Sequence, residues 1–310
     1  MPEISIVLPT YNRAEEIGRT IESVLGQDFA DFELIVVDDG SVDDTAAAVA
    51  AHDDERVVYV AQERNMGGNA ARNRGIREAR GSIVCFLDSD DEYLPHKLTT
   101  VKGFFDRHPD IDVLIDSFEY VPECRGGQDR TTTLRLNPDL KGSTEIERRI
   151  FARMLWKPTP SISARRDALF KVGLFDEGLR RRQDMDLALR LARQCRCAAT
   201  SAVLWRKHWT EGAISSTTRT FVDAVIDICD RHPDYVRKAH FRVGLERDLA
   251  RHCLRLIARG EPSMLMRDLK RIARYFGAGE TVRFIAGGVV ELARRLLPWS
   301  GGRGPEPAGK

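Results

Sequence analysis

Short apolar runs alternate with helix-like repeats along the first 120 residues of this chain. The run from Ile4 to Leu8 is continuously apolar and stops at Pro9, which predicts a strand buried on both faces. Similar runs predict strands over residues 32–37, 57–60, 83–87 and 113–118. Between the strands, apolar residues recur every three or four positions, which predicts helices over residues 14–25, 44–51, 69–79 and 95–108.

This alternation favours an α/β fold with a doubly wound, mostly parallel sheet of Rossmann-like type. Ligands of such sheets bind beyond the carboxyl ends of the strands. Polar segments follow three of the predicted strands, at residues 9–13, 38–41 and 88–91. Two of these segments contain paired acids, and clustered carboxylates repel each other unless a cation or ligand binds them. We therefore expect the three segments to share one binding site.

The rest of the chain changes character in steps. Residues 121–145 are polar and glycine-containing, which indicates an irregular segment. Further elements are predicted in the order helix, strand, helix, strand, over residues 145–155, 161–163, 184–193 and 203–205. After about residue 216 the sequence is rich in Arg and Leu, with helices expected over residues 242–257, 263–276 and 281–297. These patterns predict a catalytic domain at 1–215, a helical region at 216–300 and a disordered tail at 301–310.

Composition narrows the class of protein. Hydrophobic residues make up 42% of the 310 residues, and the net charge is only +1, so no electrostatic attraction to nucleic acid is indicated. The six cysteines lack zinc-site spacing and are expected to be reduced. Neither a signal peptide nor an apolar run long enough for a bilayer is apparent. We expect a cytoplasmic protein that can contact the inner face of the plasma membrane.

The candidate chemistry begins with Asp88, Ser89 and Asp90, which directly follow the apolar run at 83–87. Two carboxylates separated by one residue on a turn suit a hard divalent cation, Mg²⁺ or Mn²⁺. Such an ion commonly completes its coordination with phosphate oxygens and water, which points to a nucleoside-diphosphate substrate. Taken alone, the motif is better explained as a solvated acidic turn or a helix N-cap, and its position after a buried strand is what favours the metal.

Several motifs together resemble the family-2 inverting glycosyltransferases of GT-A fold. They are VVDDGSVDDT at 36–45, NMGGNAARNRG at 65–75, FLDSDDEYLP at 86–95 and VGLFDEGLRRRQDMDLALRLA at 172–192. The resemblance is close over about the first 120 residues and resumes at residue 172. It implies a metal-dependent transfer of a sugar, with inversion, from a nucleotide-diphosphate donor such as a UDP-sugar. The acceptor would be a glycan or a lipid-linked molecule, as in the synthesis of cell-surface polysaccharides.

The same resemblance implies roles for individual residues. Asp90 matches the direct metal ligand and Asp88 the residue near the ribose and the metal-bound water, whereas Asp91 is expected to cap the next segment. Asp39 matches the acid that accepts a hydrogen bond from the uracil ring, and Asp38 is expected to support the turn. The remaining nucleotide-binding positions implied are Thr10, Tyr11, Arg13, Asn65, Gly68 and Arg72. A surface helix residue is an equally good interpretation of Arg72.

Asp184 matches the catalytic base of the family, which takes the proton of the acceptor hydroxyl as its oxygen attacks the anomeric carbon. The usual Glu-Asp pair of the family is Gln183-Asp184 here, which leaves the pKa of the base and the acceptor contacts open. Asp186 is the alternative base, but residues two apart do not share a helix face, so a capping or orienting role is expected. The non-functional alternative is that Asp184 is simply an acid at a helix N-terminus, where acids are common.

Features near the end of the predicted catalytic domain and beyond it are less specific. His208 resembles the histidine of the family that reaches the metal or diphosphate, although an isolated histidine is commonly structural. Trp156, Trp205 and Trp209 offer aromatic faces for an acceptor sugar, with core packing the better interpretation of Trp205. The helix at 281–297 combines an apolar face with arginines, which suits either an anionic membrane surface or packing against protein. A homodimer is compatible with the sequence.

Three other classes of protein fit the sequence less well. A non-catalytic sugar-nucleotide-binding or scaffold protein with a decayed site is supported only by Gln183. A dinucleotide-dependent dehydrogenase is disfavoured because the turn after the first strand reads Pro-Thr-Tyr-Asn-Arg and lacks the glycine-rich fingerprint. A sugar nucleotidyltransferase is disfavoured for the same absence of a glycine-rich loop. The sequence thus favours an enzyme of the glycosyltransferase class.

Overall fold

The structure, a computed structural model, describes residues 1–122, 131–209 and 220–296. These residues form two compact units. One unit contains residues 1–122, 131–209 and 230–232, and the other contains 220–229 and 233–296. The predicted domain boundary at 215–216 and the predicted tail at 301–310 lie outside the described residues.

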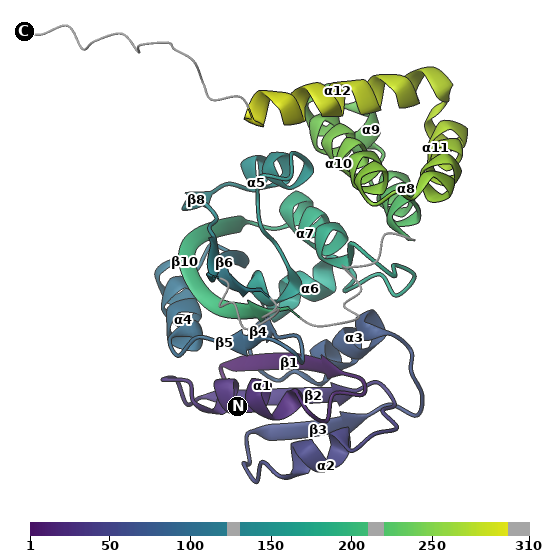
Figure 1. The fold of residues 1–310 in the computed structure, drawn as a ribbon. Coiled ribbons are helices and arrows are strands. Elements are labelled where there is room, and N and C mark those ends of the chain that lie inside the picture. The colour runs from purple at the N-terminus through teal and green to yellow at the C-terminus, as the bar shows by residue number, and fades with distance from the viewer. Residues whose placement is uncertain (123–130, 210–219, 297–310) are drawn as a thin grey trace, which may run out of the picture. The chain divides into compact units, whose positions relative to one another are not determined.

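A mixed sheet forms the centre of the first unit (Figure 1). Its strands are β1 (Ile4–Thr10), β2 (Phe32–Asp38), β3 (Val57–Ala61), β4 (Ile83–Phe86), β5 (Glu92–Tyr93), β6 (Val113–Val121), β7 (Thr133–Arg135), β8 (Leu140–Lys141), β9 (Ile162–Arg165) and β10 (Cys197–His208). The strand order is β3-β2-β1-β4-β9-β6-β10-β5, with β7 beside β6 and β8 beside β10. β1, β2, β3 and β4 pair in parallel, as do β6 and β10, whereas β9 runs antiparallel between β4 and β6. The predicted α/β, mostly parallel fold class is therefore confirmed.

The helices of the first unit connect these strands. They are α1 (Ile17–Leu25), α2 (Thr45–Ala50), α3 (Gly68–Glu78), α4 (Lys97–Arg107), α5 (Ser143–Phe151), α6 (Arg166–Lys171) and α7 (Gln183–Gln194), with a 3₁₀ turn at Thr159–Ser161. Burial of every residue of β1 and β2 matches the continuous apolar runs of the sequence, because helices cover both faces of such strands.

Several sequence-based expectations were wrong in detail. The segment at 121–145, expected to be irregular, contains β7, β8 and the start of α5, while its residues 123–130 lie outside the described part. The last strand, β10, has 12 residues rather than the three predicted, because it pairs with β6 along most of its length.

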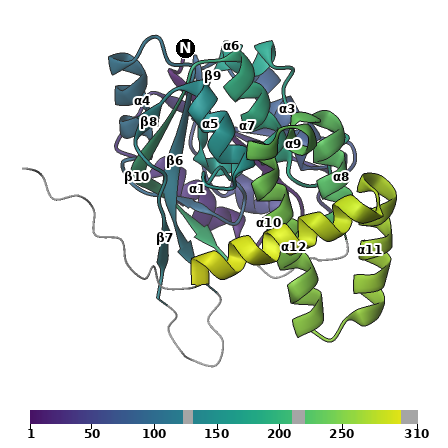
Figure 2. The ribbon, with the colours of Figure 1, turned by 90° about the horizontal axis from the view of Figure 1, so that it is seen from above.

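The second unit is helical, as the composition of this region indicated. It contains α8 (Phe221–Arg231, up to Cys229), α9 (Asp234–Arg237), α10 (Ala239–Ala258), α11 (Pro262–Phe276) and α12 (Ala278–Leu296). In Figure 2, α12 crosses α10, and α11 joins the two. Within the described ranges, no helix has both the length and the apolar character needed to cross a membrane.

The register of the parallel strands sets the positions of the polar segments. Thr10 at the end of β1 lies opposite Asp38 at the end of β2, and Asp39 N donates to Thr10 O at 2.9 Å. On the other side of β1, Leu87 N donates to Val7 O at 3.1 Å, so the acidic turn begins just past β4. All three polar segments therefore emerge at one edge of the sheet, as predicted from parallel pairing.

A buried ion pair fixes α4, the helix that follows the acidic turn. The Lys97 ammonium contacts the Asp116 carboxylate of β6, and both side chains are fully buried. Lys97 Nζ also donates to Pro160 O at 3.2 Å. Burial raises the pKa of Asp116 to about 7 even though the lysine charge opposes this shift. This contact ties α4 to the middle of the sheet.

Gly75 allows α3 to pack closely on β1 and β2. A Cβ added at Gly75 would lie 2.4 Å from Val7 Cγ1 and 3.2 Å from Val37 Cγ2. The helix can approach the sheet this closely only without a side chain at this position. Gly103, in the interior of α4, has no atom within 4 Å of an added Cβ.

We expect Gly75→Ala to destabilise the protein by about 1–3 kcal/mol, because the new methyl group overpacks the contact with Val7 and Val37. The matched change Gly103→Ala should instead stabilise it by about 0.5–1 kcal/mol, because alanine favours a helix interior. Urea unfolding followed by circular dichroism measures both. Equal effects of the same sign in the two variants would contradict this account of α3 packing.

Candidate functional site

Side chains of α1 hold the backbone of the acidic turn at residues 88–91. Thr20 Oγ1 contacts the carbonyl oxygens of Ser89 and Asp91 at 3.0 and 2.9 Å. Arg19 donates to the carbonyl oxygen of Asp90 at 3.0 Å. These contacts hold the backbone of the turn. The positions of its side chains depend on other contacts.

Two cations compensate the charge of the acidic turn. Arg72 of α3 donates to Asp88 Oδ1 at 2.6 Å, and its guanidinium is almost buried. Lys207 Nζ of β10 lies 3.5 Å from Asp91 Oδ2. Burial acts to raise the pKa of Asp88, but the charges of Arg72 and Lys207 hold this pKa below its ordinary value. The Arg72 side chain is therefore directed to the acidic turn and is not exposed on the helix surface.

Asp91 differs from the expectation that it caps the following segment. Its side chain is fully buried, and its Oδ1 accepts the backbone N–H of His208 at 3.0 Å. Burial raises the pKa of Asp91 well above its ordinary value, against the opposing charge of Lys207. Asp91 therefore joins the acidic turn to β10.

The acids after β2 organise two turns of backbone. Asp38 accepts hydrogen bonds from Ser41 N at 2.8 Å and Tyr59 Oη at 2.6 Å, which is the supporting role expected for it. Asp39 Oδ1 accepts from Gln62 Nε2 and Met66 N, each at 2.7 Å. These bonds hold the segment after β3 against the end of β2.

Asp39 keeps one acceptor position. Its Oδ2 accepts the N–H of Gly67 at 2.7 Å, the single donor to that oxygen from the part of the chain that the structure describes. A carboxylate oxygen has two lone pairs, so the second lone pair of Oδ2 has no partner among the described residues, although Asp39 is only 3% exposed. Sequence reasoning assigned Asp39 to ligand binding and missed its structural contacts with residues 62–67.

The other predicted nucleotide-binding residues lie at the end of β1, in the turn after it, and around the start of α3. Thr10 is buried, and its hydroxyl has no hydrogen-bond partner among the described residues. Tyr11 is 43% exposed, and Asn65 and Gly68 are exposed as well. Arg13 is anchored by its backbone N–H, which donates to Thr45 Oγ1 at 2.9 Å.

Asp184 lies in the first turn of α7. Its side chain is 29% exposed, with Lys157 Nζ 3.6 Å from Oδ2 and the backbone N–H of Met185 donating to Oδ1 at 2.7 Å. No contact joins Asp184 directly to the acidic turn in the described ranges, but α3 is joined to the loop that precedes α7. Arg72 lies over the ring of Phe175, and Asn69 of α3 donates to the carbonyl oxygens of Asp176 and Leu179 in the loop before α7.

His208 and the tryptophans are the remaining residues for which the sequence suggested ligand contacts. His208 Nε2 lies 2.8 Å from Glu92 Oε1, a distance typical of an ion pair but without hydrogen-bond alignment. Trp205 is fully buried and stacks on Phe118, which confirms core packing, whereas Trp156 and Trp209 are partly exposed. Within residues 1–122, 131–209 and 220–290, no three His, Cys, Asp or Glu side chains form a metal-binding group.

Sequence reasoning missed several residues of this site. Lys207, Lys157, Thr20 and Gln62 carried no motif that singled them out. Lys207 is adjacent to His208, but it is brought to Asp91 only by the alignment of β10 with β5 and β6. Long-range strand pairing leaves no local signal in the sequence.

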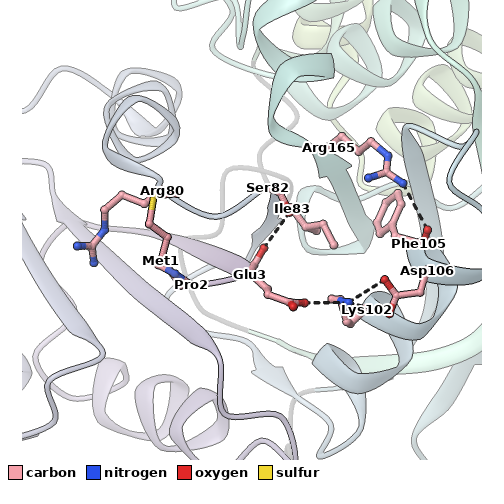
Figure 3. A pocket seen from close by; sticks show the side chains of 10 residues that line it. All are labelled: Met1, Pro2, Glu3, Arg80, Ser82, Ile83, Lys102, Phe105, Asp106 and Arg165. Carbon is pink, nitrogen blue, oxygen red and sulfur yellow. Dashed lines mark hydrogen bonds and ion pairs between the residues drawn. The ribbon is translucent and has the colours of Figure 1, made fainter.

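A separate pocket of about 310 Å³ opens at the opposite, amino-terminal edge of the sheet (Figure 3). Its charged side chains are paired with each other or with neighbouring groups: Lys102 with Glu3 and Asp106, and Arg80 with Glu33. Arg165 donates to the carbonyl oxygen of Ile111 at 3.0 Å. The charged groups that line this pocket therefore help to hold β1, β4 and α4 together.

The sheet, its acidic turn and the helix carrying Asp184 define the GT-A class of glycosyltransferase-like proteins. The profile of Glycosyl transferase family 2 matches residues 5–173, and the chain belongs to this family. The match covers β1 to α6 and confirms the family resemblance of the sequence.

Curated relatives extend the comparison. The chain is 36% identical over 236 residues to the succinoglycan biosynthesis protein ExoO of Rhizobium meliloti, covering 73% of this chain and 66% of that protein. It is 42% identical over 104 residues to a GalNAc(5)-diNAcBac-PP-undecaprenol beta-1,3-glucosyltransferase of Campylobacter jejuni, covering 33% of this chain and 34% of that protein. The chain thus spans less than two thirds of the length of each of these relatives.

Solved structures share the fold. S. aureus TarS 1-349 in complex with UDP-GlcNAc matches with a TM-score of 0.63 and 21% identity, covering 96% of this chain and 93% of that one. The mannosyltransferase PcManGT from Pyrobaculum calidifontis, in complex with GDP-Man and Mn²⁺, matches with a TM-score of 0.58 and 17% identity, covering 95% and 87%. At these identities, the likeness establishes the GT-A fold of this chain.

We expect Lys207→Met to lower the free energy of unfolding by about 1–3 kcal/mol, because it leaves the buried Asp91 carboxylate without its cation. The control Lys141→Met changes an exposed lysine on β8 and should alter this free energy by less than about 0.5 kcal/mol. Urea unfolding at neutral pH gives both values. A Lys207→Met variant as stable as the control would show that Lys207 does not compensate the turn.

Proposed function

We propose that the protein is a metal-dependent inverting glycosyltransferase. It moves a sugar from a nucleotide-diphosphate donor, most suitably a UDP-sugar, to a hydroxyl of a glycan or lipid-linked acceptor in cell-surface polysaccharide synthesis. The observation that carries this proposal is the acidic turn at 88–91, held at the carboxyl edge of the sheet by Arg72 and Lys207. Family membership and the polysaccharide-related relatives support the same reaction class.

The donor base and ribose are assigned to the ends of β1 and β2. The remaining lone pair of Asp39 Oδ2 suits the N–H of a uracil ring, and the unpartnered hydroxyl of Thr10 lies at the end of the neighbouring strand. Tyr11 and Arg13 follow on the same turn. Asn65, Gly68 and Arg72 approach from the start of α3, where paired glycines allow close contact with the sugar.

A divalent cation, Mn²⁺ or Mg²⁺, fits the residues of the acidic turn. The Asp90 side chain is partly exposed, and none of the described residues is paired with its carboxylate. Asp88 has a second carboxylate oxygen besides the one that Arg72 binds. Sites of this kind use one or two carboxylates and take further oxygens from the substrate phosphates, so a three-residue cluster is not required. When bound, the ion would neutralise charge on the departing diphosphate, with His208 as a further candidate ligand.

Asp184 is the proposed base. It accepts the proton of the acceptor hydroxyl, while that oxygen forms a bond to the anomeric carbon and the bond to the nucleoside diphosphate breaks on the opposite face. Lys157 Nζ lies 3.6 Å from its Oδ2, so the proposed base has a positive charge beside it. Asp186 is less suitable because both of its oxygens are occupied by His232 and Arg190 in a buried position.

The acceptor is proposed by analogy with the relative from C. jejuni, whose name specifies an undecaprenol-linked substrate. Such an acceptor would bring the protein to a membrane surface. The second unit exposes Met266, Tyr275 and Lys270 on α11 and Val282 on α12. We assign peripheral contact with anionic lipid to these helices.

We expect Asp184→Asn to lower kcat for transfer by about 10²–10⁴-fold, because the amide cannot take the acceptor proton. Donor binding should be unchanged, because the amide has nearly the shape of the carboxylate. Steady-state transfer and calorimetric donor binding measure the two effects. Transfer at the wild-type rate by Asp184→Asn would rule out this residue as the base.

We expect a UDP-sugar at about 100 times its Kd to stabilise the protein by about 2.7 kcal/mol, and only when Mn²⁺ or Mg²⁺ is present. Thermal-shift measurements with UDP-, GDP- and dTDP-sugars test this, with and without the ion. Asp90→Asn should abolish the metal-dependent part of the shift, whereas Asp106→Asn, at an exposed acid of α4, should keep it. A donor shift that ignores the metal would contradict metal dependence.

A further inference from the structure

Two consecutive residues far along the chain contact acids on both sides of Asp184. Arg231 Nε lies 2.5 Å from Asp176 Oδ2 in the loop before α7, and His232 Nε2 lies 2.9 Å from Asp186 Oδ1 within α7. Residues 230–232 belong to the same compact unit as α7. They lie well beyond residues 5–173, to which the family profile extends.

The contacts of His232 fix its tautomer. Its Nδ1 lies 3.1 Å from Arg193 NH1, and a guanidinium can only donate. Nδ1 is therefore the acceptor, and Nε2 carries the proton that is donated to Asp186. Arg193 is itself bound to Glu147 Oε1 of α5 at 2.6 Å. The ring is thus held on both sides in a site where the side chains of His232 and Asp186 are each 3% exposed.

Asp186 connects the His232 side chain to the first turn of α7. Its Oδ2 accepts from Arg190 at 2.6 Å, and Arg190 also donates to Val172 O at 2.6 Å. The backbone N–H of Asp186 donates to Arg182 O at 3.0 Å, which closes the turn containing Asp184. Arg182 has a φ of 62°, a left-handed conformation that an L-residue keeps only where surrounding contacts hold it.

We propose that His232 is a positioning residue, which acts through Asp186 to orient the Asp184 carboxylate towards the acceptor hydroxyl, with Arg231 as a weaker support through Asp176. This inference rests on the proposed role of Asp184 as base. A base displaced by about 1 Å loses up to about 10²-fold in rate, because proton transfer requires close alignment. Donor binding by β1, β2 and α3 does not involve this network.

The second unit provides a matched control. His252 Nε2 of α10 lies 2.8 Å from Asp268 Oδ2 of α11, and both side chains are buried. His232→Leu and His252→Leu therefore remove the same kind of buried His–Asp contact, and similar losses of stability are expected from them. Only His232 is connected to α7.

The experiment compares kcat and donor KM for transfer by the full chain. His232→Leu should lower kcat by about 10–100-fold with little change in donor KM, whereas His252→Leu should keep kcat within about twofold of wild type. His232→Gln, whose amide can both donate and accept, should recover part of the loss. Arg231→Met should lower kcat by a smaller factor, which provides a test even if His232→Leu does not fold.

The outcomes separate this inference from the proposed function. Equal kcat values for His232→Leu and His252→Leu would overturn the positioning role, as would wild-type kcat in Arg231→Met when His232→Leu cannot be folded. A parallel rise in donor KM and fall in kcat would also overturn it, since general loosening of the site predicts that result. Absence of transfer by wild type, or full transfer by Asp184→Asn, would instead reject the proposed function.

Discussion

Compensation of negative charge at one edge of the sheet is the constraint on which the rest of the site depends. The turn at 88–91 places three carboxylates within four residues, and such a cluster is unfavourable without nearby cations. Two residues supply these cations: Arg72 of α3, which precedes the turn in the sequence, and Lys207 of β10, which follows it. The conformation of the turn therefore depends on the packing of α3 and β10 beside it.

The backbone around this turn is held by contacts that do not take part in the proposed chemistry. Thr20 and Arg19 bind carbonyl oxygens of the turn, and the buried Lys97–Asp116 pair holds the helix that follows it. Among the three acids of the turn, Asp90 is the one whose carboxylate is not paired with any of the described residues. A rigid backbone with one available carboxylate is what a site needs if it is to bind a cation together with substrate oxygens.

The same principle separates the acids of α7. Asp186 is buried and bound on both oxygens, whereas Asp184, two residues earlier, is 29% exposed and close to a single lysine. Neighbouring acids on one helix turn thus have different environments, which is a common way for a protein to divide structural and chemical roles. The contact between His232 and Asp186 shows that residues beyond the family profile take part in this division.

The sequence by itself indicated β1 to β4, β6 and β9, most of the longer helices and the fold class, because continuous apolar runs and helical spacing are local signals. It did not indicate the short strands β5, β7 and β8 or the full length of β10. It also identified the three polar segments that meet at one edge, since parallel pairing brings strand ends together. The tertiary structure decided which charges meet: Lys207 with Asp91, Lys157 with Asp184 and His232 with Asp186. The residues of these pairs lie between 27 and 116 positions apart, as the numbers of Lys157, Asp184, Asp91 and Lys207 show. Their contact depends on strand register and helix packing over such distances, and no local pattern of residues encodes those.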